Sequence, residues 1–116
     1  MKEVDVKSLQ VNPFTLFGED WMALAAGMKE TGYNAMTVAW GHLGSVWERE
    51  THQNRLPTAI CYVRPSRYTK TLLDREEYFT LSHFAPEQKK ALGYLSQTVS
   101  VDSFGKRIFR QRTHCF

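Results

Sequence analysis

The apolar residues of the chain fall in short runs separated by polar stretches that contain glycine or proline. The runs WMALAAGM and AMTVAW flank the polar segment KETGY, in which Gly32 can adopt the positive φ of a tight turn. Both runs have the length of a strand, and AMTVAW has a β-branched centre. We therefore predict a β-hairpin from about Trp21 to Trp40.

The residues on either side of this hairpin predict an edge strand, a loop and a buried strand. The opening segment 2–20 alternates weakly and contains Pro13 and Gly18, which is typical of an edge strand followed by a turn. The sequence turns polar from His42 to Pro57, and the stretch ERETHQNRLP within it predicts an exposed loop. The continuous apolar run TAICYV that follows predicts a buried strand.

The second half of the chain predicts two short helices around one strand. SRYTKTLLDREE is typical of a short helix, with Ser66 as its N-cap after Pro65. YFTLSHF alternates as a strand does, and PEQKKALGYL begins with a proline, as helical first turns often do. Several strands with two inserted helices indicate a mainly β protein, a small barrel with helical excursions.

Composition sets the scale of this fold. A chain of 116 residues that is 42% hydrophobic can bury one modest core, so we expect a single domain. No apolar run approaches the roughly 20 residues that cross a bilayer, and the N-terminus lacks the apolar stretch of a secretory signal. We therefore expect a soluble, cytoplasmic protein without a membrane partner.

Cysteine and histidine spacing gives no sign of a disulfide framework or a metal centre. Cys61 and Cys115 lie far apart, and we expect both to be reduced thiols. The four histidines show no spacing, with each other or with cysteine, that resembles a metal site. We expect no metal cofactor.

The net charge of +3 is located in the last 21 residues of the chain. Residues 96–116 contain one acid, Asp102, against four basic side chains, those of Lys106, Arg107, Arg110 and Arg112. A basic tail of this kind could contact phosphate backbones without sequence preference. We favour the alternative that it is basic without such a role, so a nucleic-acid partner is not expected.

The helix predicted after Arg64 carries its charges against its own dipole. Arg67 and Lys70 fall in the first turn, whereas the acids Asp74, Glu76 and Glu77 fall near the last. This placement costs roughly 0.3 to 1 kcal/mol per charge, and an anion at the N-terminus would reverse it. A phosphate cradle could then be formed by Arg64, Ser66, Arg67 and Thr69. The alternative is a set of solvated arginines paired with nearby acids, and spacing alone favours neither.

A polar amide and an indole stand in the second strand of the predicted hairpin. Asn34 is hard to explain as a core residue because a buried amide needs several hydrogen-bond partners. Trp40, at the strand end, is by itself more typical of a core. A heteroaromatic ring with donors and acceptors along its edge would satisfy both side chains, and a flavin that carries a phosphate is such a ligand.

These segments resemble the flavin reductase-like proteins of the FMN-binding split-barrel family, including the flavoredoxin type. The resemblance runs from about Asn12 to Tyr94 through the strings NPFTLFGEDWMALAAG, GYNAMTVAWGHLGSVW, PTAICYVRPSRYTKTLL, EEYFTLSHF and KKALGYL. It implies a split β-barrel, a homodimer, and FMN held near the subunit interface. The flavin contacts that it implies are Asn34, Thr37 and Trp40, and the phosphate or ribityl contacts are Arg64, Ser66, Arg67, Tyr68 and Thr69.

The resemblance ends near residue 95, which divides the chain into a partial flavin reductase-like domain, 1–95, and a divergent basic tail, 96–116. Family members continue with an SGRD-like segment and further strands, whereas this chain continues with SQTVSVDSFGKRIFRQRTHCF. We therefore expect the C-terminal part of the barrel to be missing. A frame change or a truncated gene would produce this boundary, and a genomic sequence without an in-frame continuation in any frame would contradict that hypothesis.

The resemblance implies an oxidoreductase in which NADH or NADPH delivers hydride to FMN. No acid or base in the sequence is required for this chemistry, so we name no catalytic residue. Two alternatives remain open at the level of sequence. One is a flavin-binding electron carrier without reductase activity, and the other is a truncated, inactive relic of the family.

Overall fold

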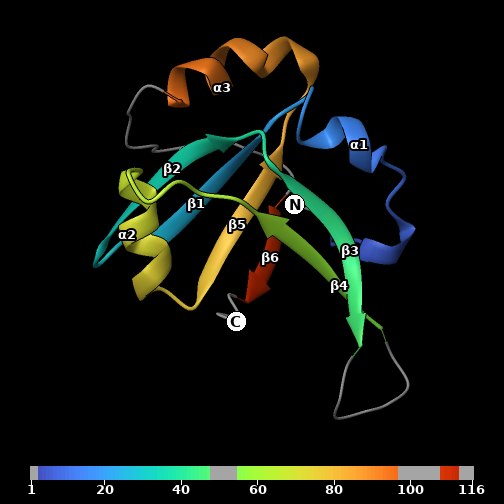
Figure 1. The fold of residues 1–116 in the computed structure, drawn as a ribbon, viewed down its shortest axis with the longest axis horizontal. Coiled ribbons are helices and arrows are strands. Elements are labelled where there is room, and N and C mark those ends of the chain that lie inside the picture. Colours follow the sequence, from blue (N-terminus) through green and yellow to red (C-terminus); the bar gives the residue numbers. More distant parts are fainter. Residues whose placement is uncertain (1–2, 48–54, 97–107, 113–116) are drawn as a thin grey trace.

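The computed structural model describes residues 3–47, 55–96 and 108–112, the last of these as backbone. These segments form strands and short helices, and the first four strands follow one another without a described helix between them (Figure 1). In chain order they are η1 (Val6–Ser8), α1 (Pro13–Leu16), β1 (Met22–Met28), β2 (Gly32–Val38), β3 (Gly41–Trp47), β4 (Arg55–Cys61), α2 (Tyr68–Arg75), β5 (Tyr78–His83), η2 (Pro86–Gln88), α3 (Lys89–Leu95) and β6 (Ile108–Arg112).

The described strands form two antiparallel sheets. The larger sheet has the order β2-β1-β5-β6, and the smaller is the ribbon β3-β4, which extends beyond the larger sheet in Figure 1. A mainly β class with short helices is therefore confirmed. The described strands do not close into a barrel, so the split barrel stays a prediction. β6 belongs to the predicted basic tail and pairs with β5 from Tyr78↔Arg112 to Ser82↔Ile108.

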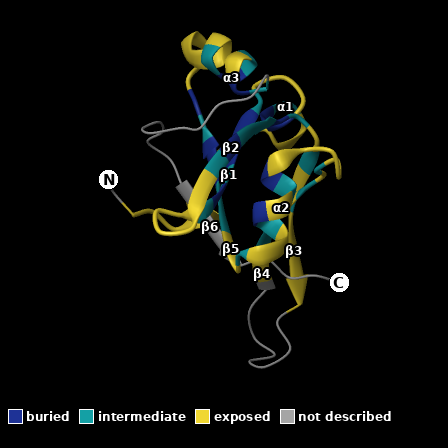
Figure 2. Cartoon of the chain, turned by 90° about the vertical axis from the view of Figure 1, so that its left-hand side faces the viewer, coloured by how far each residue is buried: buried dark blue, intermediate teal, exposed yellow. Residues whose placement is uncertain are grey.

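The larger sheet is covered on both faces, and a different set of elements covers each. On one face, Met22, Leu24 and Leu81 form a core with α1 and with partly buried residues of α2 and the ribbon. On the other face, Ala23 packs with Phe84 and with Leu92 of α3. Figure 2 shows the buried residues concentrated on β1, β2 and the inner sides of α2 and α3. The sheet therefore holds α2 and α3 on opposite sides of β2.

The predicted hairpin is confirmed as β1 and β2, which pair from Met22↔Val38 to Met28↔Gly32. Gly27 and Gly32 have φ values of 105° and 83°, a region that favours glycine because it has no Cβ. The strand predicted at YFTLSHF forms as β5, and the two predicted helices after it and after Arg64 are also confirmed.

The edge strand predicted in the opening segment is wrong. The described part of that segment forms η1 and α1, because capping is stronger there than weak alternation. The Asn12 side chain accepts a hydrogen bond from the Phe14 backbone N–H at 3.0 Å, and Pro13 occupies the first helical position. Asp5 accepts from the Lys7 N–H at 3.0 Å and caps η1 in the same way.

The exposed loop predicted at ERETHQNRLP, residues 48–57, is also wrong over its described part, which begins at Arg55. Residues 41–47 form β3, and β4 begins at Arg55; residues 48–54 lie outside the described part of the chain. These strands are polar because one face of the ribbon lies in solvent, which a composition argument mistakes for a loop.

Two local predictions around β4 and α2 need correction for related reasons. The TAICYV strand forms, but it is not buried, because Ile60 keeps 42% of its surface exposed and Tyr62 keeps 56%. Only one face of the β3-β4 ribbon packs against the core, and Ile60 lies on the other face. The N-cap of α2 is Arg67 rather than Ser66, and no side chain caps the first turn.

We expect Gly27→Ala to destabilise the protein by about 2 to 3 kcal/mol. A Cβ at Gly27 would lie 2.6 Å from the Tyr33 Cα and nearer still to the Gly32 carbonyl, on a backbone with φ of 105°. Gly93→Ala is the matched control: it lies in α3 with open space around its Cα, and should stabilise by roughly 0.5 to 1 kcal/mol. Urea unfolding measures both, and equal midpoints would contradict the account of the hairpin.

Candidate functional site

The loop between β4 and α2 turns back on itself just before the helix begins. The Arg67 N–H donates to the Arg64 carbonyl at 3.0 Å, which closes a turn around Pro65 and Ser66. α2 then starts at Tyr68 with no side-chain cap on its first backbone N–H groups. The helix N-terminus therefore presents its positive dipole end, without a capping side chain, beside Ser66 and Arg67, which are both exposed.

The same loop lies against the end of the hairpin. The Tyr62 N–H donates to the Trp40 carbonyl at 3.1 Å, and the Arg64 guanidinium lies 4.9 Å from the centre of the Trp40 ring. Trp40 is 55% exposed, so this cation–π contact is at the surface. The structure thus brings Trp40, one of the predicted flavin contacts, beside Arg64, one of the predicted phosphate contacts.

Asn34 has its partner inside the protein. Its Nδ2 donates to Thr69 Oγ1 at 3.0 Å, and Thr69 is 1% exposed. This bond joins β2 to the first turn of α2 and gives a partner within the protein to the amide that the sequence left unexplained. Both residues lie beneath the candidate loop and help to hold it in place.

Thr37 and Arg67 both bond to the last part of α3. The Thr37 hydroxyl donates to the Leu92 carbonyl, and Arg67 Nη1 donates to the Ser96 carbonyl at 3.1 Å. The predicted site residues therefore do not form one open cluster. Trp40, Arg64, Ser66, Arg67 and Tyr68 are exposed, whereas Asn34, Thr37 and Thr69 connect β2 with the two helices.

The pairing of both arginines with nearby acids, one of the two alternatives from the sequence, is not seen. In segments 3–47 and 55–96 neither Arg64 nor Arg67 forms an ion pair. Lys70 does pair with Asp74, one turn along α2. Arg64 and Arg67 therefore have no acid partner in these segments and can attract an external anion, whereas the charge of Lys70 is paired.

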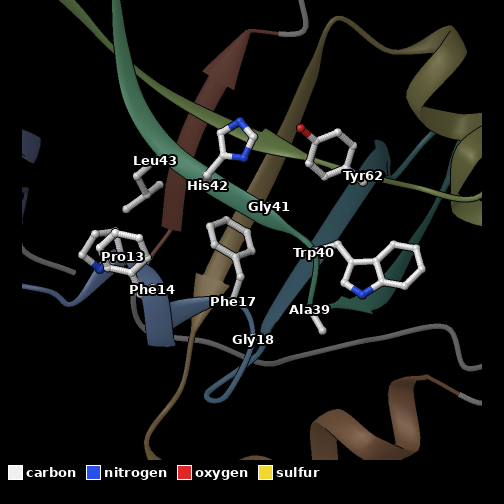
Figure 3. A pocket seen from close by; sticks show the side chains of 10 residues that line it. All are labelled: Pro13, Phe14, Phe17, Gly18, Ala39, Trp40, Gly41, His42, Leu43 and Tyr62. Carbon is white, nitrogen blue, oxygen red and sulfur yellow. The ribbon is translucent and has the colours of Figure 1, made fainter.

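A hollow of about 400 Å³ adjoins Trp40 and is lined mainly by rings (Figure 3). Figure 3 shows these rings around the first residues of β3. A Cβ on Gly41 would lie 2.6 Å from Phe17 Cε1, so glycine at this position lets the ring pack against the strand. The lining residues are Pro13, Phe14, Phe17, Gly18, Ala39, Trp40, Gly41, His42, Leu43 and Tyr62.

Sequence reasoning missed most of this hollow. Phe14 is 89% exposed and reaches it from α1, and His42 packs edge-on to Tyr62 with ring centres 5.6 Å apart. The missed signal was the N-P-F cap sequence, which places Phe14 on a short helix. The polar character of the stretch that begins at His42 gives no sign of the position of this residue in β3, beside Tyr62.

The ionisable groups of this region include one that is strongly perturbed. Burial raises the pKa of the Cys61 thiol from 9.0 to about 12. Within the described segments, no three His, Cys, Asp or Glu side chains gather as a metal site requires. Nor does any helix there have the length and apolar character needed to cross a membrane.

Comparison with known proteins gives no match to this chain, whether against models of protein families, curated proteins or solved structures.

We expect the Cys61 thiol to be inert at pH 8, because its raised pKa keeps it protonated and only the thiolate reacts. In a Cys115→Ser background, alkylation by iodoacetamide should be roughly 100-fold slower in the folded protein than in urea. Equal rates would contradict the burial of this thiol.

The same shift makes stability depend on pH. The folded state keeps the proton at pH values where the unfolded chain has lost it, so the stabilisation is full below pH 9 and is lost as pH rises toward about 12. The urea midpoint of Cys115→Ser should therefore fall above pH 9 more steeply than that of Cys61→Ala/Cys115→Ser.

Proposed function

We propose that this chain binds FMN, with the phosphate at the Arg64–Tyr68 loop and the ring against Trp40. The observation that carries the proposal is the pair of arginines without acid partners beside the uncapped start of α2, with one of them stacked on an exposed indole. Guanidinium groups and helix N-terminal N–H groups bind phosphate, and aromatic faces bind planar rings.

The residues present fit such a ligand at both ends. Arg64 and Arg67 supply forked donors for the phosphate, and Ser66 supplies a hydroxyl in the same turn. Trp40 contacts the Arg64 guanidinium of the loop and also lines the aromatic hollow, so a planar ring can lie against it. Asn34, Thr37 and Thr69 enter the proposal as residues that fix the loop rather than as direct contacts.

Bound FMN would supply hydride acceptance and electron transfer, so the proposed class is a flavin reductase-like oxidoreductase that uses NADH or NADPH. The chain's own task is to bind, orient and shield the ring. The resemblance of the sequence strings to that family supports this class. A flavin-binding electron carrier uses the same contacts, and a nicotinamide oxidation assay separates the two.

The exposed face of the ribbon supports a homodimer as the working form. Val46, Leu56 and Ile60 alternate onto the same face of β3 and β4, and each keeps 42% of its surface exposed. A two-stranded ribbon is marginally stable alone, and an apolar face of this kind is typical of an interaction site. We propose that a second copy covers it.

Arg67→Ala should weaken FMN binding by roughly 10- to 100-fold, the loss expected for a charge-assisted hydrogen bond. Arg75→Ala is the matched control, because Arg75 also donates to a backbone carbonyl, that of Thr31 at 3.3 Å, at the opposite end of α2. Isothermal titration calorimetry with FMN measures both affinities.

Equal affinities in Arg67→Ala and the parent would contradict the phosphate assignment. If the parent retains no flavin absorbance after unbound FMN is removed, the proposed function is wrong and the inactive relic is favoured. If FMN binds, steady-state oxidation of NADH or NADPH indicates a reductase, and its absence indicates the electron carrier.

Ile60→Lys should shift the protein from dimer to monomer in sedimentation equilibrium, because a charge would be buried in the proposed interface. Tyr94→Lys is the control, since Tyr94 is 64% exposed on α3, away from the ribbon. A parent protein that is already monomeric at micromolar concentration would contradict the homodimer.

A further inference from the structure

The candidate phosphate loop is tied directly to the end of α3. Arg67, the N-cap residue of α2, donates through Nη1 to the carbonyl of Ser96, the C-cap residue of α3, at 3.1 Å. These residues are 29 positions apart in the sequence. The start of one helix therefore holds the end of the other.

This bond supplies a charge that α3 lacks. The C-terminus of a helix carries a partial negative charge and is stabilised by nearby cations. α3 has no basic residue in its last turn, and among the described residues the guanidinium of Arg67 supplies a cation there. The other bonds among the described residues at this end are local: the Ser96 N–H donates to the Leu92 carbonyl at 3.3 Å, and the Ser96 hydroxyl donates to the Gly93 carbonyl at 2.6 Å.

A phosphate in the loop would compete for the same guanidinium. A bond to a phosphate oxygen is charge-assisted and can be bidentate, and it is roughly twice as strong as one to a neutral carbonyl. Arg64 is already held over Trp40, so a phosphate beside it and the start of α2 draws Arg67 back toward its own helix. The Ser96 carbonyl then loses its partner.

We infer that Arg67 is a latch between the anion site and the end of α3, which opens when a phosphomonoester binds. The inference rests on the proposed function and adds to it a conformational output. Binding would loosen the last turn of α3. The hydrogen bonds of β2 to the two helices, from Asn34 to Thr69 and from Thr37 to the Leu92 carbonyl, would stay in place and hold the rest of the fold.

Linkage makes the effect reciprocal. If FMN opens the latch, then the bond to Ser96 opposes FMN binding by the same factor. The affinity of the empty protein for phosphate is thus set partly by how firmly the end of α3 is held. Any partner that contacts the end of α3 would change flavin affinity without touching the flavin.

Amide hydrogen exchange in the last turn of α3 tests the latch in the full chain. FMN should raise exchange at Leu95 and Ser96 by about 3- to 10-fold, the range expected when one hydrogen bond is lost, and leave β1 unchanged. Riboflavin, which lacks the phosphate, should leave the exchange rate at Leu95 and Ser96 unchanged. Arg67→Ala should exchange at the faster rate without ligand and show no further change with FMN, whereas Arg75→Ala should respond as the parent does.

The outcomes separate the two proposals. Calorimetry that shows FMN bound, with exchange at α3 unchanged or slower, overturns the latch and leaves the proposed function standing. Faster exchange with riboflavin as well as FMN also overturns it, because the phosphate is then not the trigger. Absence of FMN binding overturns both. Should Arg67→Ala fail to fold, the comparison of FMN with riboflavin on the parent still decides.

Discussion

The structure depends on β1, which is hydrogen-bonded along both of its edges, to β2 on one side and to β5 on the other. Met22 and Leu24 of this strand are each 1% exposed, and their side chains form the centre of the main core. Alternate residues point to the opposite face, where Ala23 leaves room for α3. Because both faces are covered, the helices on either side are fixed with respect to β2.

The polar residues of β2 connect this strand to the helices on its two sides. A strand whose two faces both meet helices needs donors and acceptors that reach those helices, since buried polar groups without partners are costly. Asn34 meets Thr69 of α2, and Thr37 meets the Leu92 carbonyl of α3. The candidate site lies beside these hydrogen bonds, in the loop before α2, where the side chains are exposed.

Much of the fold could be predicted because it is encoded locally. The hairpin follows from Gly32 and two apolar runs, and the two helices follow from the prolines near their starts, Pro65 and Pro86. The ribbon could not be predicted by composition, since a strand that is half in solvent is as polar as a loop. The prediction of a strand in the opening segment was wrong because the capping side chain of Asn12 favours a helix more strongly than the weak period-two pattern favours a strand.

The candidate site could be predicted only in part, for a reason that is geometric. Spacing indicates that Arg64 and Arg67 share a turn, but not that Arg67 reaches across to a residue 29 positions away. The contact of Arg64 with Trp40 joins two segments that are apart in the sequence, and no local sequence pattern predicts such tertiary packing. That contact also gives the loop an optical label: the emission of an exposed indole depends on whether a guanidinium lies over it, so with Trp21 and Trp47 replaced by phenylalanine, the fluorescence of Trp40 can follow movement of the loop without any added dye.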